Sequence, residues 1–195
     1  MQVWPDRIQQ ALVELRSEQA WTVISVATSD TTIRHAARTQ IRVAVSETLA
    51  ALLDQPVLSI KLISQPGQPI LVDMPDKSVR LSVSHAVGLS VAAIHRQRSI
   101  GVDVMRVEPG TCAIPDWEVL AQDYLGPQAW GRLDCVATER RARAFAQEWT
   151  RWEAGLKCLG LALTEWTPAL QQRLASCCVI ALTLPDNYCG AIAML

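Results

Sequence analysis

An apolar stripe in the second half of the chain is the feature that most restricts how the chain can fold. The stripe residues recur at spacings of 3, 4, 3, 4 and 3, and they are Ala142, Phe145, Trp149, Trp152, Leu156 and Leu159. This is the spacing of one face of an α-helix. The sequence therefore predicts a long helix over residues 137–159, with Gly160 as its stop.

Glu153 and Lys157 flank this stripe, because each follows a stripe residue by one position. Residues four apart share one face of a helix, so the carboxylate and the amine can hold a metal ion and a phosphate side by side. The edge of an apolar stripe is also where a cleft can open. The alternative interpretation is an exposed helix ion pair, worth a few tenths of a kcal/mol.

The rest of the chain has the patterns of a mixture of helix and strands. A helix is predicted over residues 36–53, because apolar residues recur at helical spacing and Pro56 cannot continue the helix. Strands are predicted over residues 58–63, 79–85, 89–94, 100–104, 178–184 and 188–194. We expect the strands at 89–94 and 100–104 to form a hairpin. Each half of the chain, 1–99 and 100–195, thus has one long helix and several strands.

Composition and charge disfavour several classes of function. The 195 residues are 50% hydrophobic and carry a formal net charge of -1, which gives no global electrostatic reason to bind nucleic acid or an anionic membrane. No apolar stretch approaches the length of about 18 residues that a membrane-spanning helix needs, so we expect a cytoplasmic protein without a membrane partner. The six cysteines form no CxxC pair. We therefore expect reduced thiols, and we expect any metal to be bound by oxygen.

Two other segments carry polar groups on predicted strands. Asp103 is the lone carboxylate of the strand at 100–104, on the same strand face as Gly101. The missing side chain at Gly101 permits close approach of a ligand. Ser84-His85, at the polar end of an earlier strand, offers a hydroxyl, an imidazole and a backbone amide to an anion. Taken singly, these residues also fit a solvated aspartate at a strand end and a structural histidine.

Three motifs occur in a fixed order along the chain and are more specific together than singly. The proline-containing segment Gly67-Gln68-Pro69 precedes them. The first two motifs are Ser84-His85 and Gly101-Val102-Asp103-Val104, and the third is formed on one helix by Trp149-Thr150, Glu153-Ala154 and Lys157. This set resembles the phosphopantetheinyl transferases of the surfactin-synthetase (Sfp) type. That family is marked by a strand ending in Ser-His, a G-(I/V)-D-(I/V)-E strand and a W-(S/T)-x-K-E-(A/S)-x-x-K helix.

The resemblance implies an α+β fold of two pseudo-symmetric halves, each a long helix packed on a small, mostly antiparallel sheet, with the active site between them. It implies a 4′-phosphopantetheinyl transferase of the holo-[acyl-carrier-protein] synthase type. Such an enzyme moves the 4′-phosphopantetheine of coenzyme A onto a serine of an apo acyl or peptidyl carrier protein and releases adenosine 3′,5′-bisphosphate. Its carriers belong to fatty acid, polyketide or nonribosomal peptide biosynthesis. A pseudo-symmetric single chain favours a monomer.

The resemblance also implies roles for individual residues. Asp103 and Glu153 would hold Mg²⁺ or Mn²⁺, and with Lys157 they would form the catalytic set. Either Glu153 or a metal-bound water would take the proton of the attacking serine. The residues implied at coenzyme A are Arg38 at the 3′-phosphate, Gln68 and Pro69 near the adenine, Ser84 and His85 at the phosphates, and Lys157 at the pyrophosphate.

Departures from the family pattern keep a second function open. Met105 stands where many members place another carboxylate, and Trp152 replaces the lysine before the motif glutamate. Because Trp152 belongs to the apolar stripe, we expect it to be packed in the core. The alternative function is a catalytically impaired homologue that binds a carrier protein or coenzyme A without transfer. In either case an acidic carrier is expected to dock on a dense group of cations, Arg132, Arg140, Arg141 and Arg143, although a solvated helix face would have the same pattern.

Overall fold

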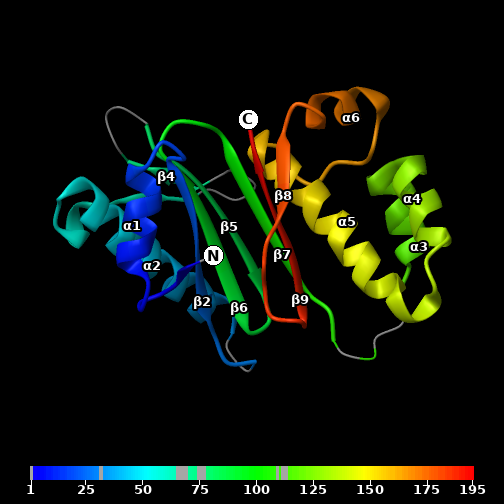
Figure 1. The fold of residues 1–195 in the computed structure, drawn as a ribbon, viewed down its shortest axis with the longest axis horizontal. Coiled ribbons are helices and arrows are strands. Elements are labelled where there is room, and N and C mark those ends of the chain that lie inside the picture. The colour runs from blue at the N-terminus through cyan, green and yellow to red at the C-terminus, as the bar shows by residue number, and fades with distance from the viewer. Residues whose placement is uncertain (1, 31–32, 65–69, 74–77, 109, 111–113) are drawn as a thin grey trace.

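The computed structural model of the chain describes residues 2–30, 33–64, 70–73, 78–108, 110 and 114–195. The elements follow in the order β1 (Gln2–Val3), α1 (Ile8–Arg16), β2 (Trp21–Ala27), α2 (Arg34–Leu53), η1 (Val57–Ser59), β3 (Leu62–Ile63), β4 (Leu71–Val72), β5 (Arg80–Ala86), β6 (Leu89–His95), β7 (Ile100–Arg106), α3 (Trp117–Leu120), η2 (Ala121–Leu125), α4 (Gly126–Asp134), α5 (Thr138–Cys158), α6 (Pro168–Leu174), β8 (Cys178–Ala181) and β9 (Tyr188–Met194). Figure 1 shows the strands in the middle of the molecule, with α1 and α2 at one end and α3 to α6 at the other.

The described strands form three sheets with mostly antiparallel pairing. The first has the order β1-β2-β6-β5, the second β3-β4 and the third β7-β9-β8. Helices with antiparallel sheets confirm the predicted α+β class, whereas the pseudo-symmetry and the division into residues 1–99 and 100–195 stay predictions. Every helix within the described residues is too short or too polar to span a membrane.

The predicted hairpin of residues 89–94 and 100–104 is wrong. β6 pairs with β2 and β5, and β7 pairs with β9. The tight turn lies one connection earlier, where Val87 and Gly88 join β5 to β6. Gly88 has a φ of +82°, a conformation that two-residue hairpin loops favour and that glycine adopts without steric cost. The loop at 96–99 therefore carries the chain from the first sheet to the third.

Two predicted strands are shorter than their sequence patterns suggest. Most of residues 58–63 lies outside regular strand, because Val57–Ser59 is a 3₁₀ turn and β3 has only two residues. Leu58 is 96% exposed, so this segment lacks the buried face that stabilises a strand. The strand predicted over 178–184 ends at Ala181.

The two long helices lie where the sequence predicts them. α2 begins two residues before the predicted range of 36–53 and ends with it at Leu53. α5 lies within the predicted range of 137–159. Gly160 follows α5 with a φ of +68°, the left-handed conformation with which many helices end. The apolar stripe of α5 packs against α3, η2, α4 and α6 in one core cluster.

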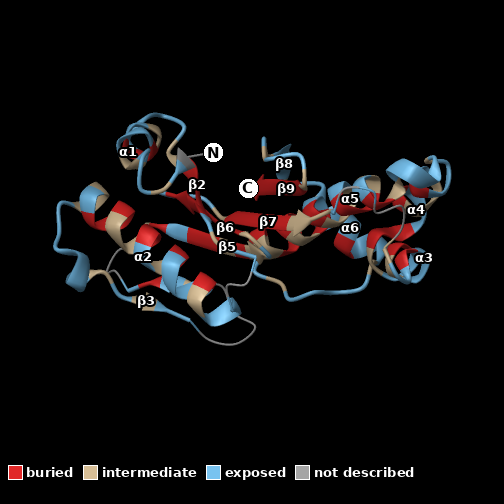
Figure 2. Ribbon diagram, turned by 90° about the horizontal axis from the view of Figure 1, so that it is seen from below, coloured by how far each residue is buried: buried red, intermediate tan, exposed pale blue. Residues whose placement is uncertain are grey.

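The first sheet is covered on both faces. Ile24 and Ile94 belong to a cluster shared with α1 and α2, whereas Val23 and Val91 belong to a cluster shared with β7 and β9. Successive strand residues point to opposite faces of a sheet, so the helices cover one face and the strands of the third sheet cover the other. Figure 2 shows buried residues running along these central strands.

Serine hydroxyls join β5 to β7 along a seam between the first and third sheets. The Ser82 Oγ accepts a hydrogen bond from the Val102 N–H at 3.0 Å, and the Ser84 Oγ accepts one from the Val104 N–H at 3.2 Å. Both amides are thereby satisfied although the two strands belong to different sheets. The seam brings Ser84 beside Asp103, which lies between the two bonded amides in β7.

Helix α5 crosses β7 at Gly101, and the two backbones almost touch. A Cβ atom at Gly101 would overlap the carbonyl oxygen of Ala154 and the amide nitrogen of Cys158. The close approach that the sequence analysis assigns to a ligand is therefore made by the helix. It places Glu153 and Lys157 within reach of the strand that carries Asp103.

The substitution Gly101→Ala is expected to lower the free energy of unfolding by about 3 kcal/mol, because a backbone cannot yield to the added methyl group as a flexible side chain would. Gly131→Ala is the matched control. A Cβ atom at Gly131, in α4, would meet no atom within 4 Å, and alanine stabilises a helix interior by about 1 kcal/mol relative to glycine. Chemical denaturation measures both changes, and wild-type stability of Gly101→Ala would contradict the close packing.

Candidate functional site

A cleft of about 1490 Å³ lies between α2 on one side and β5, β7 and α5 on the other. Charged and polar residues from all four elements line it: Arg34, His35, Arg38, Arg42, Ser84, His85, Asp103, Glu153 and Lys157. The cleft opens at the edge of the apolar stripe of α5, as predicted. It brings together Arg38, the Ser84-His85 pair, Asp103, Glu153 and Lys157, whose functional roles stay predictions.

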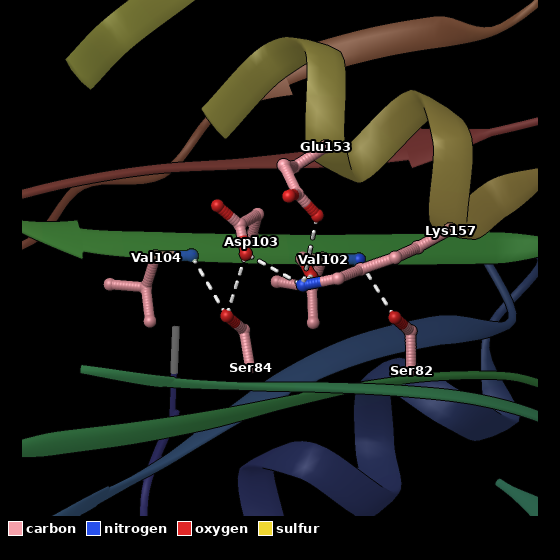
Figure 3. A network of polar contacts seen from close by, with 7 residues as sticks. All are labelled: Ser82, Ser84, Val102, Asp103, Val104, Glu153 and Lys157. Atoms are coloured by element: carbon pink, nitrogen blue, oxygen red, sulfur yellow. Dashed lines mark hydrogen bonds and ion pairs between the residues drawn. The ribbon is translucent and has the colours of Figure 1, made fainter. Parts of the chain in front are cut away.

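The Asp103 carboxylate is the centre of a polar network that links three elements (Figure 3). Asp103 is only 8% exposed, and its Oδ1 accepts hydrogen bonds from the Ser84 Oγ at 2.7 Å and from the Lys157 Nζ at 2.6 Å. The Lys157 ammonium also donates to the Val102 carbonyl oxygen at 3.2 Å. A buried charge is stable only when it is paired and hydrogen-bonded, so Asp103 is not a solvated strand-end aspartate.

Glu153 stands beside this network without being tightly bound by it. Its Oε2 lies 3.9 Å from the Lys157 Nζ, and its side chain is 20% exposed. Burial raises the pKa of Glu153, Lys157 opposes this shift, and the nearby Asp103 charge adds to it. The interpretation of Glu153 and Lys157 as an exposed helix ion pair is therefore wrong, because both are largely buried and the closer partner of Lys157 is Asp103.

Three arginines form the opposite wall of the cleft. Arg34, Arg38 and Arg42 are four residues apart on α2, so they share one face of the helix, and all three line the cleft. Arg42 is anchored by a hydrogen bond from its Nη2 to the Leu62 carbonyl oxygen at 2.6 Å. Of these three arginines, only Arg38 is among the residues predicted from the sequence. The four-residue spacing of Arg38 and Arg42 along the predicted helix was an available signal, whereas Arg34 lies before the predicted start of that helix.

His85 lies between the two walls and is held in its neutral form. Its Nδ1 is 2.9 Å from the Ser90 Oγ. Burial, and then the positive charges of Arg38, Arg34 and Lys157, lower the pKa of His85 to about 4. At neutral pH the imidazole therefore adds no charge to the site, and it can bind an anion only as a hydrogen-bonding group.

The remaining predicted positions divide into three groups. Met105 lines the cleft, where a thioether offers a hard cation no good ligand. Trp152 is packed in the core of the α5 cluster and is 7% exposed, as predicted. Gln68 and Pro69 lie outside the described residues.

The donor set fits one oxygen-preferring cation that takes its other ligands from elsewhere. Within the described part of the chain, no group of three or more His, Cys, Asp and Glu residues is arranged to hold a metal. Asp103 and Glu153 nevertheless face a single cation already, the Lys157 ammonium, at 2.6 and 3.9 Å. Mg²⁺ is commonly bound by one or two carboxylates, with waters and substrate phosphates as the other ligands. The two carboxylates are therefore a sufficient protein contribution.

Comparison with known proteins supports the resemblance found in the motifs. Residues 99–183 match the sequence profile of the 4′-phosphopantetheinyl transferase superfamily. The 4′-phosphopantetheinyl transferase HetI of Nostoc sp. (strain PCC 7120) is 29% identical over 139 residues, which are 66% of this chain and 57% of that protein. A phosphopantetheinyl transferase of Thraustochytrium sp. is 27% identical over 135 residues, which are 66% of this chain and 46% of that protein. The chain thus spans about half the length of these relatives.

The pKa of His85 is expected to be about 4, measured by nuclear magnetic resonance with His85→Gln to assign the signal. Arg38→Gln is expected to raise this pKa, because it removes a nearby positive charge, whereas Arg173→Gln on α6 is the control that leaves it unchanged. The pKa is lower in the folded chain than the ordinary 6.5, so the free energy of unfolding is expected to fall as the pH decreases from 6.5 towards 4. A His85 pKa near 6.5 would contradict the buried, positively charged surroundings.

Proposed function

Since residues 99–183 belong to the 4′-phosphopantetheinyl transferase superfamily, we propose that this protein transfers the 4′-phosphopantetheine of coenzyme A to a serine of an apo acyl or peptidyl carrier protein. Adenosine 3′,5′-bisphosphate is the second product. The observation that carries the proposal is the cleft in which arginines of α2 face the carboxylates and lysine of β7 and α5. In this proposal the cleft lies between two similar halves of one pseudo-symmetric unit, with α2 and β5 in the first half and β7 and α5 in the second.

The charge of the cleft suits a ligand with several phosphates. Arg34, Arg38, Arg42 and Lys157 contribute four positive charges, and Asp103 and Glu153 contribute two negative ones. A guanidinium fork matches the geometry of phosphate oxygens. Coenzyme A has a 3′-phosphate and a pyrophosphate, which can lie along the arginine wall and reach Lys157 at the far side.

Asp103 and Glu153 would hold Mg²⁺ in this arrangement. The chemistry that a bound Mg²⁺ supplies is positive charge at the oxygen that leaves the attacked phosphorus. Ser84 acts on this site through Asp103, because its hydroxyl donates to the Oδ1 and orients the carboxylate. Met105 adds no carboxylate, so phosphate oxygens and water would complete the ligand set.

The protein residues then have separate tasks in the transfer. The carrier serine Oγ attacks the phosphorus next to the pantetheine, and the bond from that phosphorus to the bridging oxygen breaks. Either Glu153 or a water beside it takes the serine proton. Burial raises the pKa of Glu153, which makes this carboxylate a better proton acceptor than an exposed one. Lys157 stabilises the pyrophosphate charge that increases as the bond breaks.

Transfer is expected to appear as a phosphopantetheine mass increment on an apo carrier protein incubated with the protein, coenzyme A and Mg²⁺. Asp103→Asn and Glu153→Gln are each expected to lower kcat by at least about 100-fold, because they remove charge at the reacting phosphate. Glu148→Gln is the matched control on the same helix. Its carboxylate pairs with Arg132 and lines a different, smaller cavity. Coenzyme A binding with no increment on any carrier would favour the non-catalytic binding protein.

Docking of an acidic carrier is expected to depend on Arg140 more than on its neighbours. Arg132 pairs with Glu148, Arg141 stacks on Trp117 at 4.9 Å, and Arg143 donates to the Asp186 carbonyl oxygen. Arg140 is exposed. Arg140→Glu is therefore expected to raise the KM for the carrier about threefold or more without changing kcat, whereas Arg173→Glu on α6 is the control. An unchanged KM would exclude this surface.

A further inference from the structure

One cation, the Lys157 ammonium, occupies the space between the two carboxylates of the cleft. Figure 3 shows the Lys157 side chain extending from α5 so that its nitrogen faces both Asp103 and Glu153. The Nζ is 2.6 Å from the Asp103 Oδ1 and 3.9 Å from the Glu153 Oε2. The ammonium therefore faces both of the carboxylates that would hold a metal ion in the proposed function.

The contacts of Asp103 disfavour a second cation at the same carboxylate oxygen. Its Oδ1 already accepts from the Ser84 hydroxyl and from Lys157. A divalent ion at the same carboxylate would lie close to the ammonium, beside an aspartate that is only 8% exposed. Two positive charges at that distance repel each other strongly. The lysine must therefore move before a metal can be bound by both carboxylates.

We propose that Lys157 is a tethered cation that fills the metal position in the free protein and leaves it when substrate phosphates accept the ammonium. The inference rests on the proposed function, because it assigns Lys157 a second position in the same site. Metal binding and coenzyme A binding are then coupled. The phosphates take over the positive charge of the lysine, and the vacated carboxylates become available to the metal.

The chemistry of the two cations suits this exchange. Lysine carries a compact charge on a flexible stem with several rotatable bonds, so its ammonium can swing away while the helix stays in place. Within the described residues, the only other hydrogen bond of its Nζ is the one to the Val102 carbonyl oxygen at 3.2 Å. Without coenzyme A, the ammonium keeps the buried Asp103 paired. With coenzyme A, the same charge is used on the pyrophosphate.

The inference is tested by measuring the binding of Mn²⁺ to the full chain. The electron paramagnetic resonance signal of free Mn²⁺ reports how much of the ion stays unbound. In the absence of coenzyme A, Lys157→Gln is expected to bind Mn²⁺ about tenfold more tightly than the wild type, within the usual range of such couplings. The glutamine keeps an N–H donor for Asp103 but removes the charge. Lys157→Met is the second variant, with the same expected direction, should the glutamine disturb folding.

Two control variants separate this effect from a general change in charge. Arg151→Gln removes one positive charge from α5 at an exposed residue that lines the smaller cavity, and it is expected to bind Mn²⁺ like the wild type. Lys157→Arg keeps the cation and is expected to retain weak Mn²⁺ binding. Adding coenzyme A is expected to increase the affinity of the wild type by a larger factor than that of Lys157→Gln.

Each outcome decides one part of the argument. Equal or weaker Mn²⁺ binding by folded Lys157→Gln and Lys157→Met would overturn the tethered cation. Absence of Mn²⁺ binding in every variant, with or without coenzyme A, would overturn it together with the metal-dependent part of the proposed function. Tighter Mn²⁺ binding by the Lys157 variants, combined with no mass increment on a carrier protein incubated with the wild type, would support the tethered cation and contradict the proposed transferase activity.

Discussion

The buried Asp103 carboxylate is the constraint on which the rest of the site depends. A carboxylate that is 8% exposed is stable only with charged or hydrogen-bonding partners. The protein supplies them from two other elements, the Ser84 hydroxyl of β5 and the Lys157 ammonium of α5. These contacts tie β5, β7 and α5 together at one point. Removing either partner would leave an under-compensated, mostly buried charge at the wall of the cleft.

Backbone packing makes those contacts geometrically accessible. Gly101 lets α5 lie directly on β7, and the hydroxyls of Ser82 and Ser84 hold β5 beside the same strand. The site is thus built on a helix and two strands, which position side chains more accurately than loops do. Opposite this rigid wall, α2 presents its arginines across the cleft. This arrangement of opposed charges is the basis for proposing a ligand with several phosphates.

Much of the local structure and several of the side chains that line the cleft could be predicted from sequence. Helical spacing located α2 and α5, and the motifs located Asp103, Glu153 and Lys157, which the cleft brings together. Sequence reasoning failed where partners were decided by distant segments. β6 was expected to pair with β7, yet it pairs with β5, because Gly88 allows the tighter turn. Gly101 was expected to admit a ligand, yet its neighbour is a helix more than 50 residues away.

The sequence by itself determined the two long helices, several of the strands and the candidate residues of the site, because periodicity and residue type are local properties. Tertiary structure alone decided that Lys157 pairs with Asp103 rather than chiefly with Glu153, its neighbour four residues away on the helix. It also decided that Arg34 and Arg42 line the same cleft as those carboxylates. The physical reason is that such contacts depend on how sheets and helices pack, and packing brings together residues whose spacing in the sequence contains no record of their contact.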